Sequence, residues 1–312
     1  MALIAQGQQA PAGAVPHVIH VGYAKAGSSL LQQWFLDHPE ITFRQGGLGG
    51  FQDIYDLIRT TTHLKQPRCL VTSCEGLSAP RKDAGSINVD YSDMAAKMSA
   101  RQENACQLLK TLFPNATILI VTRGFKGLMM SSYSQYVRTG GHNDLEDLFD
   151  ADGDLGCHYD ALIALYREAF AGRVTVLPYE LLSDDPGAFR TALEQVLGVG
   201  GHPFPQHRVN PSLSRIELRW YPRLARFIRR LHLGHRVRTA FVNCAFYNRL
   251  ALPIRWLDRL FPVEPVTPDC LPTSAMERFR GLAGTLETDP LYRPYADRYL
   301  FGPAPADGRP GQ

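Results

Sequence analysis

Four short and nearly continuous apolar segments recur along the chain, and polar or turn residues bound each of them. Their residues are mostly β-branched or large and aliphatic, and they do not alternate with polar ones. This pattern is typical of strands that are buried on both faces of a parallel sheet. The four predicted strands span residues 18–22, 69–72, 118–122 and 174–177.

Segments with helical periodicity lie between these strands. The last of them opens with Pro186, a residue that is common in the first turn of a helix. Strands that alternate with helices predict an α/β fold, with a central parallel sheet flanked by helices in three layers. The predicted helices span residues 29–35, 95–112, 128–137, 159–170 and 185–197.

The composition changes after the loop at residues 200–205. Residues 208–259 contain twelve arginines but only two acids, Glu217 and Asp258. Helical spacing predicts one apolar and one basic face. The basic face is either a solvated face of a helix docked on the core or a surface for an anionic glycan, lipid headgroup or nucleic acid. The apolar face would hold Ile216, Trp220, Leu224, Phe227, Ile228 and Leu231, and the basic face Arg215, Arg219, Arg223, Arg226 and Arg230.

Composition and length are those of a globular protein. The 312 residues are 45% hydrophobic and 20% charged, which argues against disorder, collagen or a coiled coil for the whole chain. No apolar run reaches the roughly 18–20 residues that a membrane span needs. The six cysteines contain no CxxC pair, so we expect free thiols in a reducing compartment and no zinc site.

The first 16 residues contain no Lys or Arg and so lack the charged start of a secretory signal. We therefore expect a disordered lead-in at residues 1–16, followed by the α/β core at 17–214. A helical, arginine-rich extension of the same domain is expected at 215–301, followed by a disordered tail at 302–312.

The segment after the first predicted strand has the chemistry of an oxyanion-binding loop. Residues 20–34, HVGYAKAGSSLLQQW, lead from a strand through a glycine-containing turn into a helix. Glycines let backbone N–H groups approach a phosphate, and a helix N-terminus adds partial positive charge. Lys25 supplies a point charge, and Ser28 and Ser29 supply hydroxyl groups. The predicted fold is therefore P-loop-like.

The loop differs from that of a nucleoside triphosphatase, in which a lysine follows the last glycine. Here Lys25 precedes Gly27, and the strand at 118–122 ends in Arg123 rather than in an aspartate that holds magnesium. Ser131 follows Arg123 by eight residues, and the two could hold a phosphate through charge-assisted hydrogen bonds. We therefore expect a ligand with an additional anionic group and no metal.

These two motifs resemble those of the sulfotransferases that use 3′-phosphoadenosine-5′-phosphosulfate (PAPS), and the bacterial and carbohydrate-type branch in particular. The resemblance covers about two thirds of the chain. It implies that Arg123 and Ser131 hold the 3′-phosphate and that the motif RVNPSLS at 208–214, with Arg208 and Ser212, closes over the nucleotide. The residues implied for the 5′-phosphosulfate are Lys25, Ala26, Gly27, Ser28 and Ser29.

Glu75 follows the strand at 69–72, on the rim where Lys25 and Arg123 are expected. The resemblance implies that Glu75 is the catalytic base, although a structural pairing with Lys25 or an arginine is the alternative. Lys25 would also stabilise the charge on the leaving phosphate. The histidine that the cytosolic type uses has no counterpart here, because His63 precedes the strand, and we expect His20 to be a core histidine.

The expected reaction is transfer of a sulfuryl group to a hydroxyl or amine of an acceptor, such as a glycan or a lipid-linked glycan. Two other classes of protein stay open: a P-loop kinase or NTPase with a degenerate loop, and a non-catalytic basic module that binds membrane or nucleic acid through residues 208–259. For the sulfotransferase we expect no nucleic-acid partner. We also expect a cytoplasmic location, with possible peripheral membrane contact through the arginine-rich helix.

Overall fold

The computed structural model of the protein describes residues 15–23, 25–48, 67–78, 94–150, 157–205, 213–231, 234–247 and 249–302. The chain forms two compact units, and each unit combines segments that are distant in sequence. The first contains Met1–Gly124, Asp154–Val209 and Gly281–Phe301, and the second contains Phe125–Gly153, Asn210–Arg280 and Gly302–Gln312. Each unit is described below by itself.

A five-stranded parallel sheet forms the centre of the first unit, in the order β2-β3-β1-β4-β5. This confirms the predicted α/β class and all four predicted strands. The three-residue β2 was not predicted, because so short a segment shows no clear pattern. The strands are β1 His17–Gly22, β2 Ile41–Phe43, β3 Cys69–Cys74, β4 Thr117–Thr122 and β5 Val174–Pro178.

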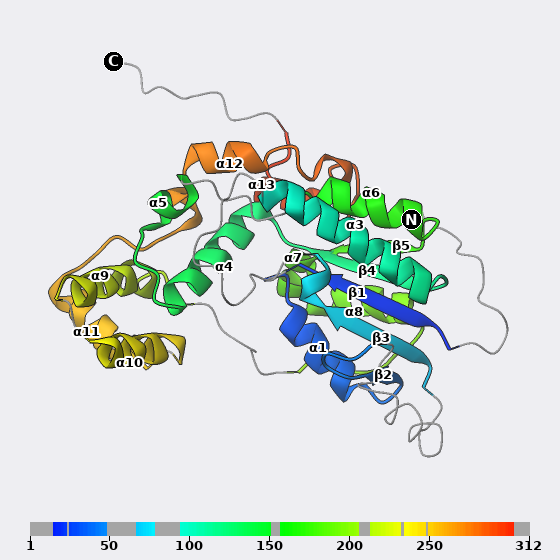
Figure 1. The fold of residues 1–312 in the computed structure, drawn as a ribbon, viewed down its shortest axis with the longest axis horizontal. Coiled ribbons are helices and arrows are strands. Elements are labelled where there is room, and N and C mark those ends of the chain that lie inside the picture. Colours follow the sequence, from blue (N-terminus) through cyan, green and yellow to red (C-terminus); the bar gives the residue numbers. More distant parts are fainter. Residues whose placement is uncertain are drawn as a thin grey trace. The chain divides into compact units, whose positions relative to one another are not determined.

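Helices cover both faces of this sheet (Figure 1). Helices α3 and α6 pack against each other on one face, while the Trp34 ring of α1 and the Phe189 ring of α8 both contact Phe204 on the other. Helix α8 begins where Asp185 accepts a hydrogen bond from the Ala188 N–H. The helices are α1 Ser28–Asp37, α3 Met94–Leu112, α6 Tyr159–Ala169, α7 Tyr179–Asp184 and α8 Pro186–Leu197.

The strand order places a topological switch point at the centre of the sheet. After β1 the chain continues to β2 and β3 on one side, and then crosses to β4 and β5 on the other. Ligands of open α/β sheets bind at the carboxyl ends of the strands at such a point. The register pairs Gly22 of β1 with Val121 of β4, so the loop after β1 and Arg123 start from neighbouring strand ends.

The C-terminal segment of the first unit packs against β4. It contains the short helices η4 Gly284–Leu286, η5 Arg293–Tyr295 and α13 Ala296–Tyr299. The hydroxyls of Tyr292 and Tyr299 lie 2.8 and 2.9 Å from the Thr122 hydroxyl. Residues 281–301 therefore belong to the compact unit of the sheet. The expected division into a core at 17–214 and an extension of the same domain at 215–301 stays a prediction.

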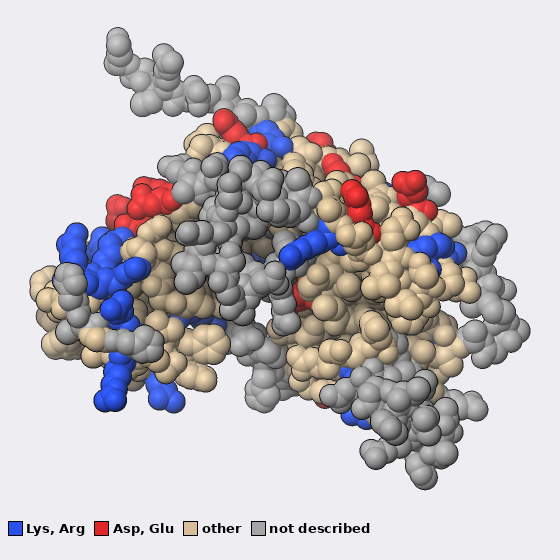
Figure 2. Space-filling model, viewed as in Figure 1, with Lys and Arg blue, Asp and Glu red and all other residues tan. Residues whose placement is uncertain are grey.

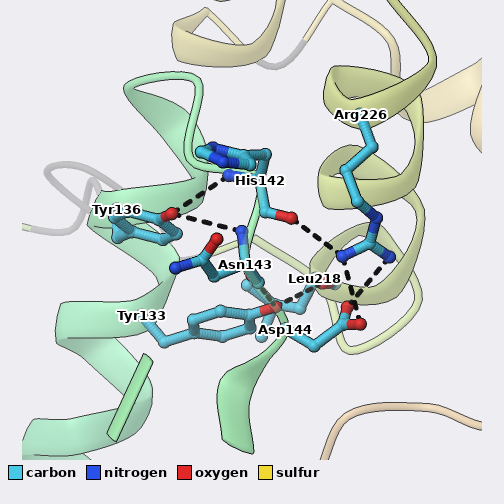
Figure 3. A network of polar contacts seen from close by, with 7 residues as sticks. All are labelled: Tyr133, Tyr136, His142, Asn143, Asp144, Leu218 and Arg226. Atoms are coloured by element: carbon cyan, nitrogen blue, oxygen red, sulfur yellow. Dashed lines mark hydrogen bonds and ion pairs between the residues drawn. The ribbon is translucent and has the colours of Figure 1, made fainter. Parts of the chain in front are cut away.

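The second unit is helical over its described residues. Tyr136 and Arg226 fix the turn between α4 and α5: the Tyr136 hydroxyl accepts hydrogen bonds from the N–H groups of His142 and Asn143, and Arg226 pairs with Asp144 at 3.1 Å (Figure 3). The helices are α4 Phe125–Arg138, α5 Leu145–Asp150, α9 Glu217–Arg230, α10 His235–Phe246, α11 Ala251–Leu260, η3 Pro268–Cys270 and α12 Thr273–Phe279.

The structure corrects the predicted faces of α9. Its buried residues are Glu217, Leu218, Tyr221, Pro222 and Ala225, whereas Phe227 and Leu231, which we expected on the docked face, are exposed. Arg226, expected on the solvated basic face, pairs with Asp144 and donates to the His142 carbonyl. Helical spacing alone could not show this, because Tyr221 packs against Phe241 and Trp220 donates to Asp258, and both partners lie outside the helix.

Candidate functional site

Two glycines let the loop after β1 fold closely against its surroundings. At Gly22 a Cβ atom would lie 2.8 Å from the Ser28 hydroxyl, and at Gly27 it would lie 2.9 Å from the Tyr179 ring. Gly27 also has a φ of +82°, which favours glycine. Helix α1 begins at Ser28, so the loop leads directly to a helix N-terminus, whose first N–H groups have no acceptor within the helix.

Lys25 and Arg123 lie together at the end of the sheet. Lys25 has a φ of +69°, an uncommon conformation for a residue with a side chain. The Arg123 guanidinium donates a hydrogen bond of 2.6 Å from Nη1 to the Lys25 carbonyl oxygen. This bond fixes the lysine backbone and joins the loop to the end of β4. The structure therefore brings together two of the predicted site residues.

Tyr179 completes this arrangement from the neighbouring strand. It follows Pro178, the last residue of β5, and the centre of its ring lies 4.6 Å from the Arg123 guanidinium carbon. A cation so placed over an aromatic face is attracted to it. The same ring also lies against Gly27. Three segments, the ends of β1, β4 and β5, thus meet around one tyrosine that the sequence analysis did not identify.

Glu75 lies in a short turn at the carboxyl end of β3, as predicted. It begins η1, Glu75–Leu77, and is partly exposed. Ser78 ends this turn, and its hydroxyl donates to the Gly22 carbonyl at 2.5 Å. The turn is therefore anchored on the residue where β1 passes into the Lys25 loop.

A buried polar network supports the end of β4. Glu180 is only 3% exposed, and its two carboxylate oxygens accept hydrogen bonds from the Gly124 N–H at 2.9 Å and the Tyr299 hydroxyl at 3.0 Å. The hydroxyl of Tyr159 donates to the Arg123 carbonyl at 2.7 Å. These contacts hold the backbone on both sides of Arg123. Local periodicity could not predict them, since they join residues up to 119 positions apart.

Other predicted site residues are placed as follows. The Ser28 hydroxyl is buried and donates to the Tyr23 carbonyl at 3.3 Å, while Ser29 is exposed. Ser131 is in α4 of the second unit; this helix begins three residues earlier than predicted, so Ser131 is its seventh residue rather than near its start. Arg208 and Ser212 lie outside the described residues.

His20 is a core histidine, as expected. It is fully buried in β1, with its Nδ1 2.8 Å from the Ser73 hydroxyl. Burial lowers its pKa to about 4, because the charged imidazolium would lose its hydration. His17, on the same strand, lies 2.9 Å from the Thr72 hydroxyl, and burial likewise lowers its pKa to about 4. Both imidazoles are therefore neutral, and each contacts a hydroxyl of the neighbouring strand β3.

Comparisons with known proteins agree with this architecture. Residues 16–203 match the model of the sulfotransferase family, which is more than half of the chain. The chain therefore belongs to the sulfotransferase family and is a transferase, as the two motifs predicted. No curated protein matches it.

Two solved structures are similar to this chain. One is a sulfotransferase from Alicyclobacillus acidocaldarius, with 19% identity, a TM-score of 0.42, and coverage of 72% of this chain and 99% of that one. The other is mouse sulfotransferase SULT7A1 complexed with PAP, with 14% identity, a TM-score of 0.33, and coverage of 68% of this chain and 65% of that one.

The described residues show neither a metal-binding cluster nor a membrane-spanning helix. They contain no group of three or more His, Cys, Asp or Glu side chains placed to hold a metal ion. No helix among them is both long and apolar enough to cross a bilayer. All six cysteines carry free thiols, and the thiol of Cys69 is buried, which raises its pKa to about 12.

Proposed function

We propose that the protein transfers a sulfuryl group from PAPS to a hydroxyl of an acceptor, most simply a carbohydrate or a lipid-linked glycan. The observation that carries this proposal is the contact of Arg123 with the Lys25 backbone. This contact brings the Arg123 guanidinium, at the end of β4, to the Lys25 loop, at the end of the adjacent strand β1. The chain belongs to the sulfotransferase family. The donor PAPS has anionic groups at two ends, and these two cations suit them.

The close-fitting loop supports the same proposal. Gly27 leaves no room for a side chain, and the N–H groups that begin α1 favour an anion. In this proposal Lys25, Ala26, Gly27, Ser28 and Ser29 hold the 5′-phosphosulfate. Arg123 and Ser131 hold the 3′-phosphate, and Arg208 and Ser212 close over the nucleotide.

The reaction forms a bond between the acceptor oxygen and sulfur and breaks the bond between sulfur and the phosphate oxygen. In this proposal Glu75 accepts the proton of the acceptor hydroxyl, and Lys25 stabilises the negative charge on the leaving phosphate. A positioned base contributes about 10²–10⁴ in rate. No metal takes part, because the cations of the protein do the work that magnesium does in kinases.

Thermal unfolding of the full chain with a nucleotide tests this assignment. We expect 3′-phosphoadenosine-5′-phosphate, the desulfated product, to raise the melting temperature, because a ligand of the native state stabilises it by about 2.7 kcal/mol at 100 times its Kd. We expect ATP with magnesium to shift it far less. Arg123→Gln should remove the shift, whereas the control Arg101→Gln, an exposed change on α3, should keep it.

The opposite preference, for ATP with magnesium, would favour the kinase or NTPase. A protein that binds neither nucleotide would not be a PAPS-dependent enzyme. Turnover is then measured as release of the bisphosphate nucleotide from PAPS, with and without candidate glycan acceptors. An acceptor that increases this release identifies the acceptor class.

A further inference from the structure

The second unit carries an unusual number of exposed apolar side chains. Of the fifteen large hydrophobic residues that are exposed among the described residues, nine lie between residues 227 and 261. They belong to α9, α10, α11 and the residues that follow each helix. Five of the nine are aromatic. These nine are Phe227, Leu231, Val237, Phe246, Tyr247, Leu252, Trp256, Leu260 and Phe261.

Helix α11 shows the pattern most clearly. Leu252, Trp256 and Leu260 are spaced four residues apart, so they form one row along the helix. Their exposed fractions are 75%, 62% and 53%. Ile254, about half a turn from Trp256, is buried and attaches the helix to the unit. The apolar row therefore faces away from the core.

Arginines flank this apolar row. Arg255 and Arg259, also four residues apart, form a second exposed row beside it. Figure 2 shows Lys and Arg atoms gathered on the part of the molecule that carries α9 to α11. We call the row of Leu252, Trp256 and Leu260, together with Arg255 and Arg259, the apolar–arginine surface. Other exposed arginines of the same unit are Arg223, Arg229, Arg230, Arg236, Arg238 and Arg249.

The two acids of residues 208–259 accept hydrogen bonds from neutral N–H groups within the unit. Glu217 is 4% exposed and accepts the Ser214 N–H at 2.6 Å, while Asp258 accepts the Trp220 indole N–H at 3.4 Å and the Val263 N–H at 3.2 Å. Both carboxylates are occupied within the unit. The surface thus combines exposed apolar side chains with exposed arginines.

We propose that the apolar–arginine surface binds an anionic lipid bilayer. Leucine and aromatic side chains enter the boundary between headgroups and acyl chains, and tryptophan and tyrosine are enriched at that depth. Arginine has a long apolar stem, so its guanidinium reaches the lipid phosphates while the stem stays in contact with the apolar row. The proposal does not depend on the sulfuryl transfer reaction.

Charge and composition argue against the other occupants. A second copy of this chain that docked through the same surface would place Arg255 and Arg259 against two more arginines. A nucleic acid would satisfy the arginines, but exposed leucines such as Leu252 and Leu260 would stay in water. A bilayer satisfies both kinds of side chain at once.

Sedimentation of the full chain with vesicles tests the proposal. We expect binding to vesicles of phosphatidylcholine with about 30% phosphatidylserine, weaker binding at high salt, and little binding to phosphatidylcholine alone. Arg255→Gln with Arg259→Gln should weaken the binding about 30-fold, at roughly 1 kcal/mol per arginine. Leu252→Ser with Trp256→Ser should weaken it by at least as much. The emission of Trp256, one of three tryptophans, should move to shorter wavelength on binding.

The matched control is Arg101→Gln with Arg167→Gln, which removes the same charge from exposed positions on α3 and α6. It should bind vesicles as the unchanged protein does, and circular dichroism checks that every variant is folded. Binding that survives both α11 variants overturns the proposal. Loss with the arginine pair but not with the Leu252 and Trp256 pair also overturns it, because a bilayer requires both. A dimer that the Leu252 and Trp256 changes abolish, or tighter binding to RNA than to vesicles, overturns it as well.

Discussion

At the scale of single residues, backbone groups hold the conformation of the loop that carries the Lys25 ammonium. The loop conformation depends on the glycines and on the Lys25 carbonyl oxygen, which accepts from Arg123 at 2.6 Å. A change of side chain leaves that carbonyl in place. The positive φ is as uncommon for alanine as for lysine, so the change adds no new backbone strain.

We therefore predict that Lys25→Ala abolishes sulfuryl transfer while the melting temperature stays within a few degrees of that of the unchanged protein. The reason is loss of the positive charge that stabilises the leaving phosphate. The measurement is single-turnover release of nucleotide, with a parallel thermal scan. Lys110→Ala on α3 is the matched control, and turnover by a folded Lys25→Ala protein would exclude the proposed role.

A change at Glu75 can test catalysis separately from nucleotide binding. Its turn is fixed by the Ser78 hydroxyl on Gly22, and the Glu75 backbone carbonyl accepts the Ser78 N–H at 3.4 Å. Neither of these contacts uses the carboxylate. Glu75→Gln should therefore keep the turn and the nucleotide affinity.

We predict that Glu75→Gln lowers turnover by about 10²-fold or more, since an amide cannot accept the proton of the acceptor. Calorimetry with the bisphosphate nucleotide should give an unchanged Kd. Glu103→Gln, an exposed change on α3, serves as control. Turnover equal to that of the unchanged protein would remove Glu75 as the base, and a large loss of affinity would mean that it pairs structurally with a cation of the site.

At the scale of elements, Glu180 connects three parts of the first unit. It lies in α7, directly after β5, and accepts hydrogen bonds from Gly124 after β4 and from Tyr299 of α13. The carboxylate of Glu180 in α7 thus holds the backbone next to Arg123, and Tyr299 of α13 holds that carboxylate. Glu180 acts as a positioning residue for Arg123.

We predict that Glu180→Ala destabilises the protein by about 1–3 kcal/mol, because the buried Gly124 N–H and Tyr299 hydroxyl lose their acceptor. It should also weaken binding of the bisphosphate nucleotide at temperatures where the variant is still folded. Glu180→Gln retains one acceptor oxygen and should restore most of that affinity. Denaturant unfolding and calorimetry on the folded protein separate the two effects, and an unchanged Kd in Glu180→Ala would show that Arg123 needs no such support.

The same elements show what the sequence could predict. Continuous apolar segments identify β1, β3, β4 and β5, because a strand that is buried on both faces has apolar residues on both. All four strands are parallel, so the residues after them, Lys25, Glu75 and Arg123, come to one edge of the sheet. Local periodicity carries that information. It does not carry the contacts of Tyr179 with Arg123 or of Tyr299 with Glu180, because each joins residues that only the folded chain brings together.

The error over α9 has a related cause. Phe227 and Leu231 fit an apolar helical face, yet they are exposed, and the buried side contains Tyr221 and Pro222 instead. Periodicity measures only how apolar residues are spaced. It cannot tell apolar residues that pack on the protein from apolar residues that stay exposed, and α9 carries both kinds.

At the scale of the whole molecule, two histidines make stability depend on pH. Burial lowers the pKa of His17 and His20 to about 4, whereas an unfolded histidine has a pKa of 6.5. Between these values the unfolded chain binds more protons than the folded one. The free energy of unfolding therefore falls as the pH falls from 6.5 toward 4.

We predict that the protein loses stability between pH 7 and pH 5, with His20 alone contributing about 2 kcal/mol. Protonation would leave a charged ring in the centre of the sheet, where its Nε2 has no hydrogen-bond partner among the described groups. Urea unfolding at the two pH values measures the difference, and His20→Asn provides the comparison. This change lowers stability at both pH values, since a buried ring is lost, but it should reduce the difference between them. If the difference in His20→Asn equals that of the unchanged protein, His20 does not cause the acid sensitivity.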